Sequence, residues 1–143
     1  MKIALPTLKK FQFEMVLPIR WGDMDAMGHV NNVSYFRYLE TCRLDWFNSL
    51  GIKASPKGLG PIIANGFCNF YREFAYPGNV LMKLYTSDPS RTTFEAWTTL
   101  EDAANPGTIM AEGGATVIWV DFAVMRAVTL PDEVRQLVTP ESP

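Results

Sequence analysis

Three side chains that could do acid–base or nucleophilic chemistry lie close together near the start of the chain: Asp23, Asp25 and His29. The glycines beside them, Gly22 and Gly28, allow the backbone to approach a ligand closely. A carboxylate in such a loop could attack a polarised carbon, or direct a water molecule to attack it. His29 is the only histidine, and no suitable partner stands near it in the sequence. A histidine-dependent triad is therefore not expected.

A helix directly after this loop would add a second chemical element. Asn31 and Asn32 are good N-caps and Gly51 is a good C′ residue, so we expect a helix from about Val33 to Leu50. The first amides of a helix lack intrahelical partners and carry the positive end of its dipole. They can hold a carbonyl oxygen that is gaining negative charge. One apolar stripe is expected on this helix: Tyr35, Phe36, Leu39, Cys42, Trp46, Phe47 and Leu50.

The same loop has a plainer interpretation. Aspartate, asparagine and glycine are the usual residues of any segment that leads into a helix, where they form turns and caps. Local chemistry alone therefore does not distinguish a catalytic loop from a structural one.

The stretch WGDMDAMGHVNNVSYFRYLE, from Trp21 to Glu40, resembles the signature of hotdog-fold acyl-CoA thioesterases of the 4-hydroxybenzoyl-CoA thioesterase type. Those enzymes carry an Asp-x-Asp-x-x-Gly-His-Val-Asn-Asn-like run that leads into their central helix. Weaker similarity extends to YREFAYPGN at Tyr71 to Asn79 and to GGATVIWVD at Gly113 to Asp121. Asn79 departs from the family, which commonly has an aspartate there. Element order and length agree over most of the chain.

The resemblance implies a role for each motif residue. It assigns catalysis to Asp25, as general base or nucleophile, and assigns polarisation of the thioester carbonyl to the amide of Asn32. Asp23 is expected to brace the loop. The other motif positions are expected to shape the loop or the acyl pocket: Gly28, His29, Asn31 and Tyr35. Glu40 is a rival acid, because related hotdog enzymes place a glutamate on the central helix. An exposed or dimer-facing helix charge explains Glu40 equally well.

The activity that the resemblance implies is hydrolysis of an acyl-CoA, or of an acyl carrier protein thioester, to a free acid and a thiol. Two alternatives stay open. One is a hotdog 3-hydroxyacyl thioester dehydratase, which needs a histidine paired with an acid, and the other is a non-catalytic acyl-CoA-binding module. No metal and no bound cofactor are implied. The resemblance implies a homodimer formed by joined sheets, often a dimer of dimers (a homotetramer), with acyl sites at the subunit interface.

Composition predicts one globular domain over residues 1–143, because 48% of the residues are hydrophobic and 13% are aromatic. The 13 basic and 15 acidic residues are interspersed and give a net charge of −2, which argues against a nucleic-acid-binding surface. No stretch reaches the roughly 20 apolar residues of a membrane span. Cys42 and Cys68 are interpreted as free buried thiols of a reducing compartment. A cytoplasmic location is therefore expected.

Alternating apolar and polar residues predict one strand before the loop, at Phe11 to Trp21, and four strands after the helix. These four are expected at about Ile62 to Phe74, Val80 to Ser87, Thr92 to Glu101 and Thr108 to Val120, with hairpin turns between the last three. A short helix is expected at Leu130 to Val138. This order predicts an α+β fold with an antiparallel sheet of five or six strands wrapped around one long central helix, as in the hotdog fold.

Two groups of side chains are candidates for contacts with an acyl-CoA. An acyl tunnel could be lined by aromatic residues, although core packing explains each of them as well: Phe36, Trp46, Phe47, Phe67 and Phe70. Phosphates of coenzyme A could meet Lys57, Arg72 or Arg91, although scattered basic residues usually lie on solvated surface.

Overall fold

The computed structural model describes residues 1–53 and 55–142. In this part of the chain the elements follow in the order β1 (Lys10–Pro18), the short 3-10 helix η1 (Trp21–Asp23), α1 (Asn32–Ser49), β2 (Leu59–Phe70), β3 (Asn79–Ser87), β4 (Thr93–Asp102), β5 (Ile109–Asp121), β6 (Arg126–Ala127) and α2 (Asp132–Val138). The predicted α+β class is confirmed. No strand was predicted at the position of the two-residue β6.

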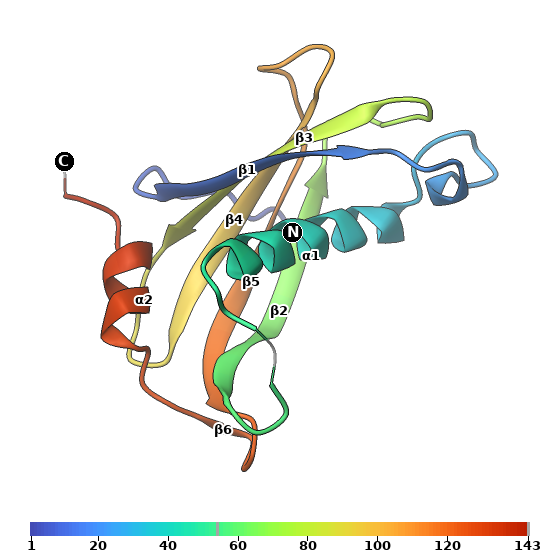
Figure 1. Cartoon of the computed structure of the whole chain (residues 1–143). Coiled ribbons are helices and arrows are strands. Elements are labelled where there is room, and N and C mark those ends of the chain that lie inside the picture. The colour runs from blue at the N-terminus through green and yellow to red at the C-terminus, as the bar shows by residue number, and fades with distance from the viewer. Residues whose placement is uncertain (54, 143) are drawn as a thin grey trace.

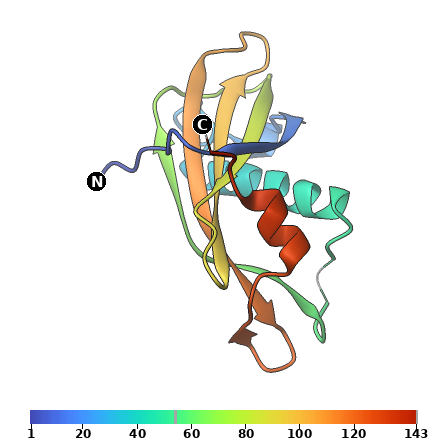
Figure 2. The same ribbon diagram turned by 90° about the vertical axis from the view of Figure 1, so that its left-hand side faces the viewer.

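All strands belong to one antiparallel sheet with the order β1-β3-β4-β5-β2, and β6 pairs with the end of β5. Both helices lie on the same face of this sheet (Figures 1 and 2). The N-terminal segment runs along the opposite face (Figure 2), where the Asn69 side chain donates to the Ile3 carbonyl at 2.6 Å. β1 and β2 are therefore the two edges, and α1 runs across one face of the sheet, in front of the strands in Figure 1.

Helix α1 begins and ends within one residue of the prediction. Asn31 is the N-cap, and its side chain accepts a hydrogen bond from the Val33 amide at 2.9 Å. Gly51 follows the helix with a φ of +75°, which only glycine adopts at no steric cost. The buried face is Tyr35, Tyr38, Leu39, Cys42, Trp46 and Phe47.

Phe36 and Leu50 were wrongly expected on this buried face, since they are 43% and 39% exposed. Successive residues of an α-helix point about 100° apart, so a stripe that contains Tyr35 and Leu39 also contains Tyr38 and turns Phe36 toward solvent. The predicted stripe omitted Tyr38, which is buried. Tyr35 and Cys42 lie about one turn before and after it on the same face, and this spacing would have placed Tyr38 on the stripe.

Helix α1 approaches the sheet closely because β5 carries a glycine there. A Cβ at Gly113 would lie 2.6 Å from Leu39 Cδ1 and 2.7 Å from the Phe67 carbonyl oxygen. Either contact is too short for a real side chain, so the absence of a side chain sets the spacing between helix and sheet.

Strand β2 differs from its predicted range of Ile62 to Phe74. It starts at Leu59 because an edge strand tolerates Pro61, whose missing N–H costs no bond on the open side. It ends at Phe70 because the Tyr71 and Arg72 amides both donate to the Met110 carbonyl, each at 2.9 Å, so regular pairing stops. The residues after it form a loop rather than a strand.

Strand β1 also stops earlier than the predicted Trp21, because the chain turns into η1. Strands β3, β4 and β5 and helix α2 match their predicted ranges to within one or two residues. Among the described residues, no helix has the length and apolar character that crossing a bilayer would require.

We predict that Gly113→Ala lowers the free energy of unfolding by about 1–3 kcal/mol, because the new methyl group overpacks the contact with Leu39. Gly22→Ala, in η1, is the control, since its Cβ would meet nothing within 4 Å. Its effect should stay within about 0.5 kcal/mol. Urea denaturation of both variants measures the difference, and equal losses would contradict the tight contact.

Candidate active site

Asp23 fixes the loop between β1 and α1. Its Oδ2 accepts hydrogen bonds from the Arg20 amide at 2.9 Å and from the Tyr38 hydroxyl at 2.6 Å. Its carbonyl accepts from the Asn31 amide at 2.8 Å. Burial, together with the hydrogen bond to Asp23, raises the pKa of Tyr38, so this hydroxyl keeps its proton. Asp23 thus ties both ends of the loop to the first turns of α1.

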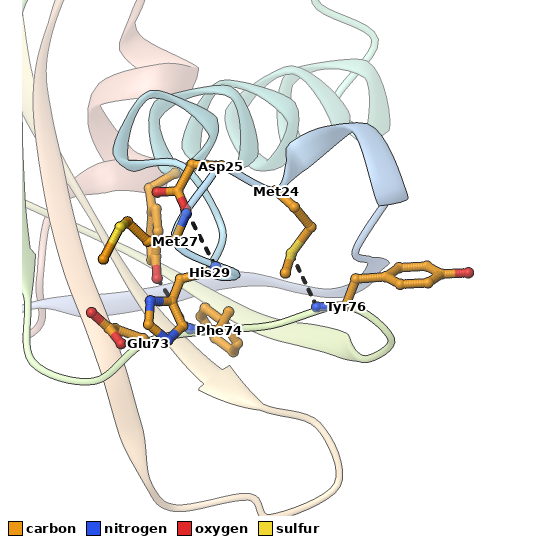
Figure 3. Close-up of polar contacts among 8 residues, drawn as sticks. Met24, Asp25, Met27, His29, Glu73, Phe74 and Tyr76 are labelled. Carbon is orange, nitrogen blue, oxygen red and sulfur yellow. Dashed lines mark hydrogen bonds and ion pairs between the residues drawn. The ribbon is translucent and has the colours of Figure 1, made fainter.

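Asp25 lies in the middle of this loop and is exposed. Its Oδ1 accepts from the backbone amides of Met27 at 2.8 Å and His29 at 3.3 Å, and its own amide donates to the His29 carbonyl at 2.8 Å (Figure 3). Gly28, with a φ of +82°, allows the turn that makes these contacts. Within the described residues Oδ2 makes no hydrogen bond, so one oxygen is anchored and the other is available.

The start of α1 offers one amide beside Asp25. The Val33 amide donates to the side chain of Asn31 and the Ser34 amide donates to its carbonyl, both at 2.9 Å. The Asn32 amide has no acceptor among the described residues. An N–H group in this position, at the positive end of a helix, can stabilise an oxygen that gains negative charge.

His29 has an acidic partner, contrary to the sequence-based expectation. Its Nε2 lies 2.9 Å from Oε2 of Glu73, and both side chains are partly exposed (Figure 3). Glu73 is remote in sequence, and the loop after β2 reaches the site because the Val30 amide donates to the Phe74 carbonyl at 2.8 Å. No local sequence signal connects these segments, so only the folded chain reveals this pair.

Tyr35 forms the inner wall of the site. Its hydroxyl accepts from the Phe74 amide at 3.3 Å, and its ring meets the edge of Phe70 with centroids 4.9 Å apart. Burial is the main cause that raises the pKa of Tyr35, so the phenol stays neutral. A neutral hydroxyl here can donate a hydrogen bond to a ligand while it accepts one from the backbone.

These groups surround one cavity of about 620 Å³, within the range of roughly 300–1,000 Å³ that small-molecule sites occupy. Its lining is Asp25, Met27, His29, Val30, Asn32, Tyr35, Phe70, Tyr71, Arg72 and Glu73. Four predicted site residues therefore share the cavity, which we call the Asp25 cavity: Asp25, His29, Asn32 and Tyr35. Gly28 and Asn31 shape its rim through the turn and the helix cap.

Asp23 and Glu40 lie outside the Asp25 cavity. Together they line a shallower hollow on the solvent side of α1. Glu40 is bound by Arg37, with 2.7 Å between Arg37 Nη1 and Glu40 Oε1. Within one chain, Glu40 therefore does not share a cavity with Asp25.

The predicted tunnel aromatics and phosphate-binding cations are dispersed. Phe70 and Arg72 line the Asp25 cavity, and Phe47 lines a second cavity farther along α1. Trp46 is part of the core. Phe67 stacks against Trp97, with 6.0 Å between ring centroids. The remaining candidates lie away from the Asp25 cavity: Phe36, Lys57 and Arg91.

Known proteins resemble the chain in sequence and in fold. A model of the thioesterase-like superfamily matches residues 19–138. The uncharacterized protein YsmA of Bacillus subtilis is 30% identical over 63 residues, and the match covers 44% of this chain and 43% of that protein, which is less than half its length.

Two solved structures resemble the chain over most of their length. The PA2801 protein of Pseudomonas aeruginosa, a proposed thioesterase, is 31% identical with a TM-score of 0.83, covering 89% of this chain and 98% of that one. A proposed acyl-CoA thioesterase of Xanthomonas campestris is 30% identical with a TM-score of 0.70, covering 78% and 95%. These likenesses confirm the predicted hotdog arrangement of sheet and helix.

We predict that Tyr38→Phe destabilises the protein by about 1–3 kcal/mol, because it leaves the Asp23 carboxylate without its buried donor. Tyr71→Phe is the matched control, since it removes a hydrogen bond of equal length, 2.6 Å to Glu112, from an exposed tyrosine. The control should cost clearly less. Thermal unfolding followed by circular dichroism compares them, and an unaffected Tyr38→Phe would show that Asp23 is held by its backbone contacts alone.

Proposed function

The chain belongs to the thioesterase-like superfamily, and from this premise we propose that it is an acyl-CoA thioesterase that hydrolyses an acyl thioester to a carboxylic acid and a free thiol. One observation carries the proposal: the Asp25 carboxylate and the Asn32 amide line the same cavity, and among the described residues one carboxylate oxygen has no donor and the amide has no acceptor. The 4-hydroxybenzoyl-CoA type of enzyme is the more specific form of this proposal.

In the proposed reaction the thioester carbonyl oxygen accepts from the Asn32 amide, which makes the carbon more electrophilic. The free oxygen of Asp25 either removes a proton from an attacking water or attacks the carbon itself to form a mixed anhydride that water then hydrolyses. In the first route the thiol leaves after water has added to the carbon, and in the second it leaves as the anhydride forms, before water releases the acid. The backbone amides of Met27 and His29 hold the other oxygen of Asp25 in place.

Other residues of the cavity support binding in this proposal. Tyr35 and Phe70 present apolar surface to the acyl group. Arg72, at the same cavity, supplies a cation for a phosphate of coenzyme A or of an acyl carrier protein's prosthetic arm. A cytoplasmic location stays a prediction.

The first test is thiol release from a panel of aliphatic and aromatic acyl-CoAs. Asp25→Asn should lower kcat by about 100-fold or more while acyl-CoA binding persists, because the carboxylate is removed and the shape is kept. Glu40→Gln is the control acid outside the cavity and should retain activity. Undiminished turnover in Asp25→Asn would reject Asp25 and favour Glu40.

A proline at position 32 tests the helix amide. Asn32 is the first residue of α1, where proline is well tolerated, and Asn31, with a ψ of 137°, already has the extended conformation that a residue before proline prefers. Asn32→Pro should therefore remove one N–H donor and lower kcat by about 10²- to 10³-fold without unfolding the helix. Asn32→Ala keeps the N–H and serves as the control. Equal activity of the two variants would contradict the role of the amide.

The contact between His29 and Glu73 favours one second candidate, a dehydratase that acts on 3-hydroxyacyl thioesters, because that reaction needs a histidine paired with an acid. A 3-hydroxyacyl-CoA assay separates the two. Thiol release supports the hydrolase, whereas an enoyl product that disappears in Glu73→Gln would support the dehydratase.

We propose that the protein forms a homodimer, or a dimer of dimers, through β2. This strand is an edge of the sheet, and its residues 63–66 are exposed. An open edge without flanking charges can pair with a second copy of itself.

Ala64→Lys should weaken such a dimer, because it places two equal charges near the two-fold axis. Light scattering after size-exclusion chromatography measures the mass at several concentrations. Glu14→Lys on β1, the other edge, is the control. A wild-type monomer at every concentration would overturn the proposed assembly.

A further inference from the structure

A second cavity, of about 270 Å³, lies beside the C-terminal half of α1. Leu44 and Phe47 of α1 form one wall, and Pro61 and Ile63 of β2 form the other. The lining is mostly apolar, and the volume is slightly below the roughly 300–1,000 Å³ of complete small-molecule sites. This space therefore suits one end of a longer ligand, and we call it the Arg43 cavity after its cation.

Arg43 is partly buried in this apolar wall. Burial lowers the pKa of its guanidinium from the ordinary value, and the nearby charge of Glu40 opposes that change. Glu40 also lines the cavity, but its carboxylate is bound by Arg37 at 2.7 Å. Among residues 1–53 and 55–142, Arg43 has no ion pair and no side-chain hydrogen bond. Its five N–H donors therefore favour an anionic group inside the cavity.

The Arg43 cavity and the Asp25 cavity both lie between helix α1 and strand β2. Arg43 follows Tyr35 by about 12 Å along the helix, and the two cavities border β2 at Ile63 and at Phe70 respectively. If two β2 strands pair antiparallel about an axis near Asn65, Phe70 of one strand lies opposite Gly60 of the other, next to Pro61 in the wall of the Arg43 cavity. Each Arg43 cavity then adjoins the Asp25 cavity of the partner subunit. An acyl group could extend from one cavity into the other.

We propose that Arg43 selects acyl groups that end in a carboxylate, so that the preferred substrates are thioesters of dicarboxylic acids. The thioester lies at Asp25, the methylene chain follows the apolar walls, and the guanidinium of Arg43 donates two hydrogen bonds to the terminal carboxylate. The apolar lining disfavours the nucleotide end of coenzyme A here. This inference rests on the proposed thioester hydrolysis for its substrate, on the proposed β2 dimer for the contact between the two cavities, and on the Arg43 cavity for its specificity.

The kinetic test compares adipoyl-CoA with hexanoyl-CoA, whose acyl chains are equally long and differ in the terminal carboxylate. The wild-type chain should prefer adipoyl-CoA. Arg43→Gln should lower kcat/KM for adipoyl-CoA by about 10- to 100-fold, the loss expected for a hydrogen bond between charged groups, and leave hexanoyl-CoA hydrolysis unchanged. Arg126→Gln is the control, since its guanidinium belongs to an exposed residue of β6 that lines neither cavity. Arg43→Lys should recover only part of the preference, because it lacks the planar fork.

A binding test does not depend on hydrolysis. Calorimetry with hexanoate, whose carboxylate can reach Arg43 while its chain fills the apolar part, should give binding that Asp25→Asn retains and Arg43→Gln loses. If no thioester is hydrolysed but this pattern holds, the proposed function fails and the Arg43 cavity remains a carboxylate site.

Three outcomes overturn the inference. If the chain hydrolyses hexanoyl-CoA as well as adipoyl-CoA, and Arg43→Gln has no effect, Arg43 does not determine substrate specificity. If Arg43→Gln loses binding of free coenzyme A and keeps binding of hexanoate, Arg43 binds the phosphates of the carrier instead. Equal losses on both substrates together with a change of oligomeric state would show that Arg43 pairs with a second copy of the chain. Circular dichroism establishes that each variant is folded.

Discussion

The hydrogen bond from Tyr38 to Asp23 is the constraint on which the site depends. It joins a buried position of α1 to the middle of the loop, and the 2.6 Å contact is supported by the Arg20 amide on the same carboxylate oxygen. Because a partly buried carboxylate needs such donors, the loop has few alternative conformations. Asp25, two residues later, is thereby held beside the first amide of the helix.

The close contact between α1 and the sheet has a comparable role at the level of the fold. Without a side chain at Gly113, Leu39 lies directly on β5, and the start of the helix meets the loop that follows β2. The backbone contact between Val30 and Phe74 then joins the two loops. The Asp25 cavity is the space left between the helix start, the loop before it and this second loop. A small residue in the sheet therefore determines the geometry of a site that contains neither Gly113 nor Leu39.

The open edge at β2 gives the two cavities a common boundary. One borders an exposed carboxylate and the first amide of α1, and the other borders a partly buried guanidinium among apolar side chains. An apolar wall lowers the local dielectric and so strengthens the attraction between a cation and an anion, which must offset the water that both groups lose. This arrangement connects the proposed chemistry at one end of a substrate with recognition of its other end.

Much of the fold was predictable because it follows from local rules. The caps Asn31 and Gly51 bound α1, turn residues separate β3, β4 and β5, and the motif resemblance joined Asp25, Asn32 and Tyr35, which the structure brings into one cavity. Tertiary structure alone decided the partner of His29, because Glu73 approaches through backbone bonding between distant loops. It also decided that Glu40 lies apart from Asp25 and that Arg43, in an apolar wall, has no ion pair among the described residues. Such pairings depend on which elements pack together, and residue order by itself does not specify that.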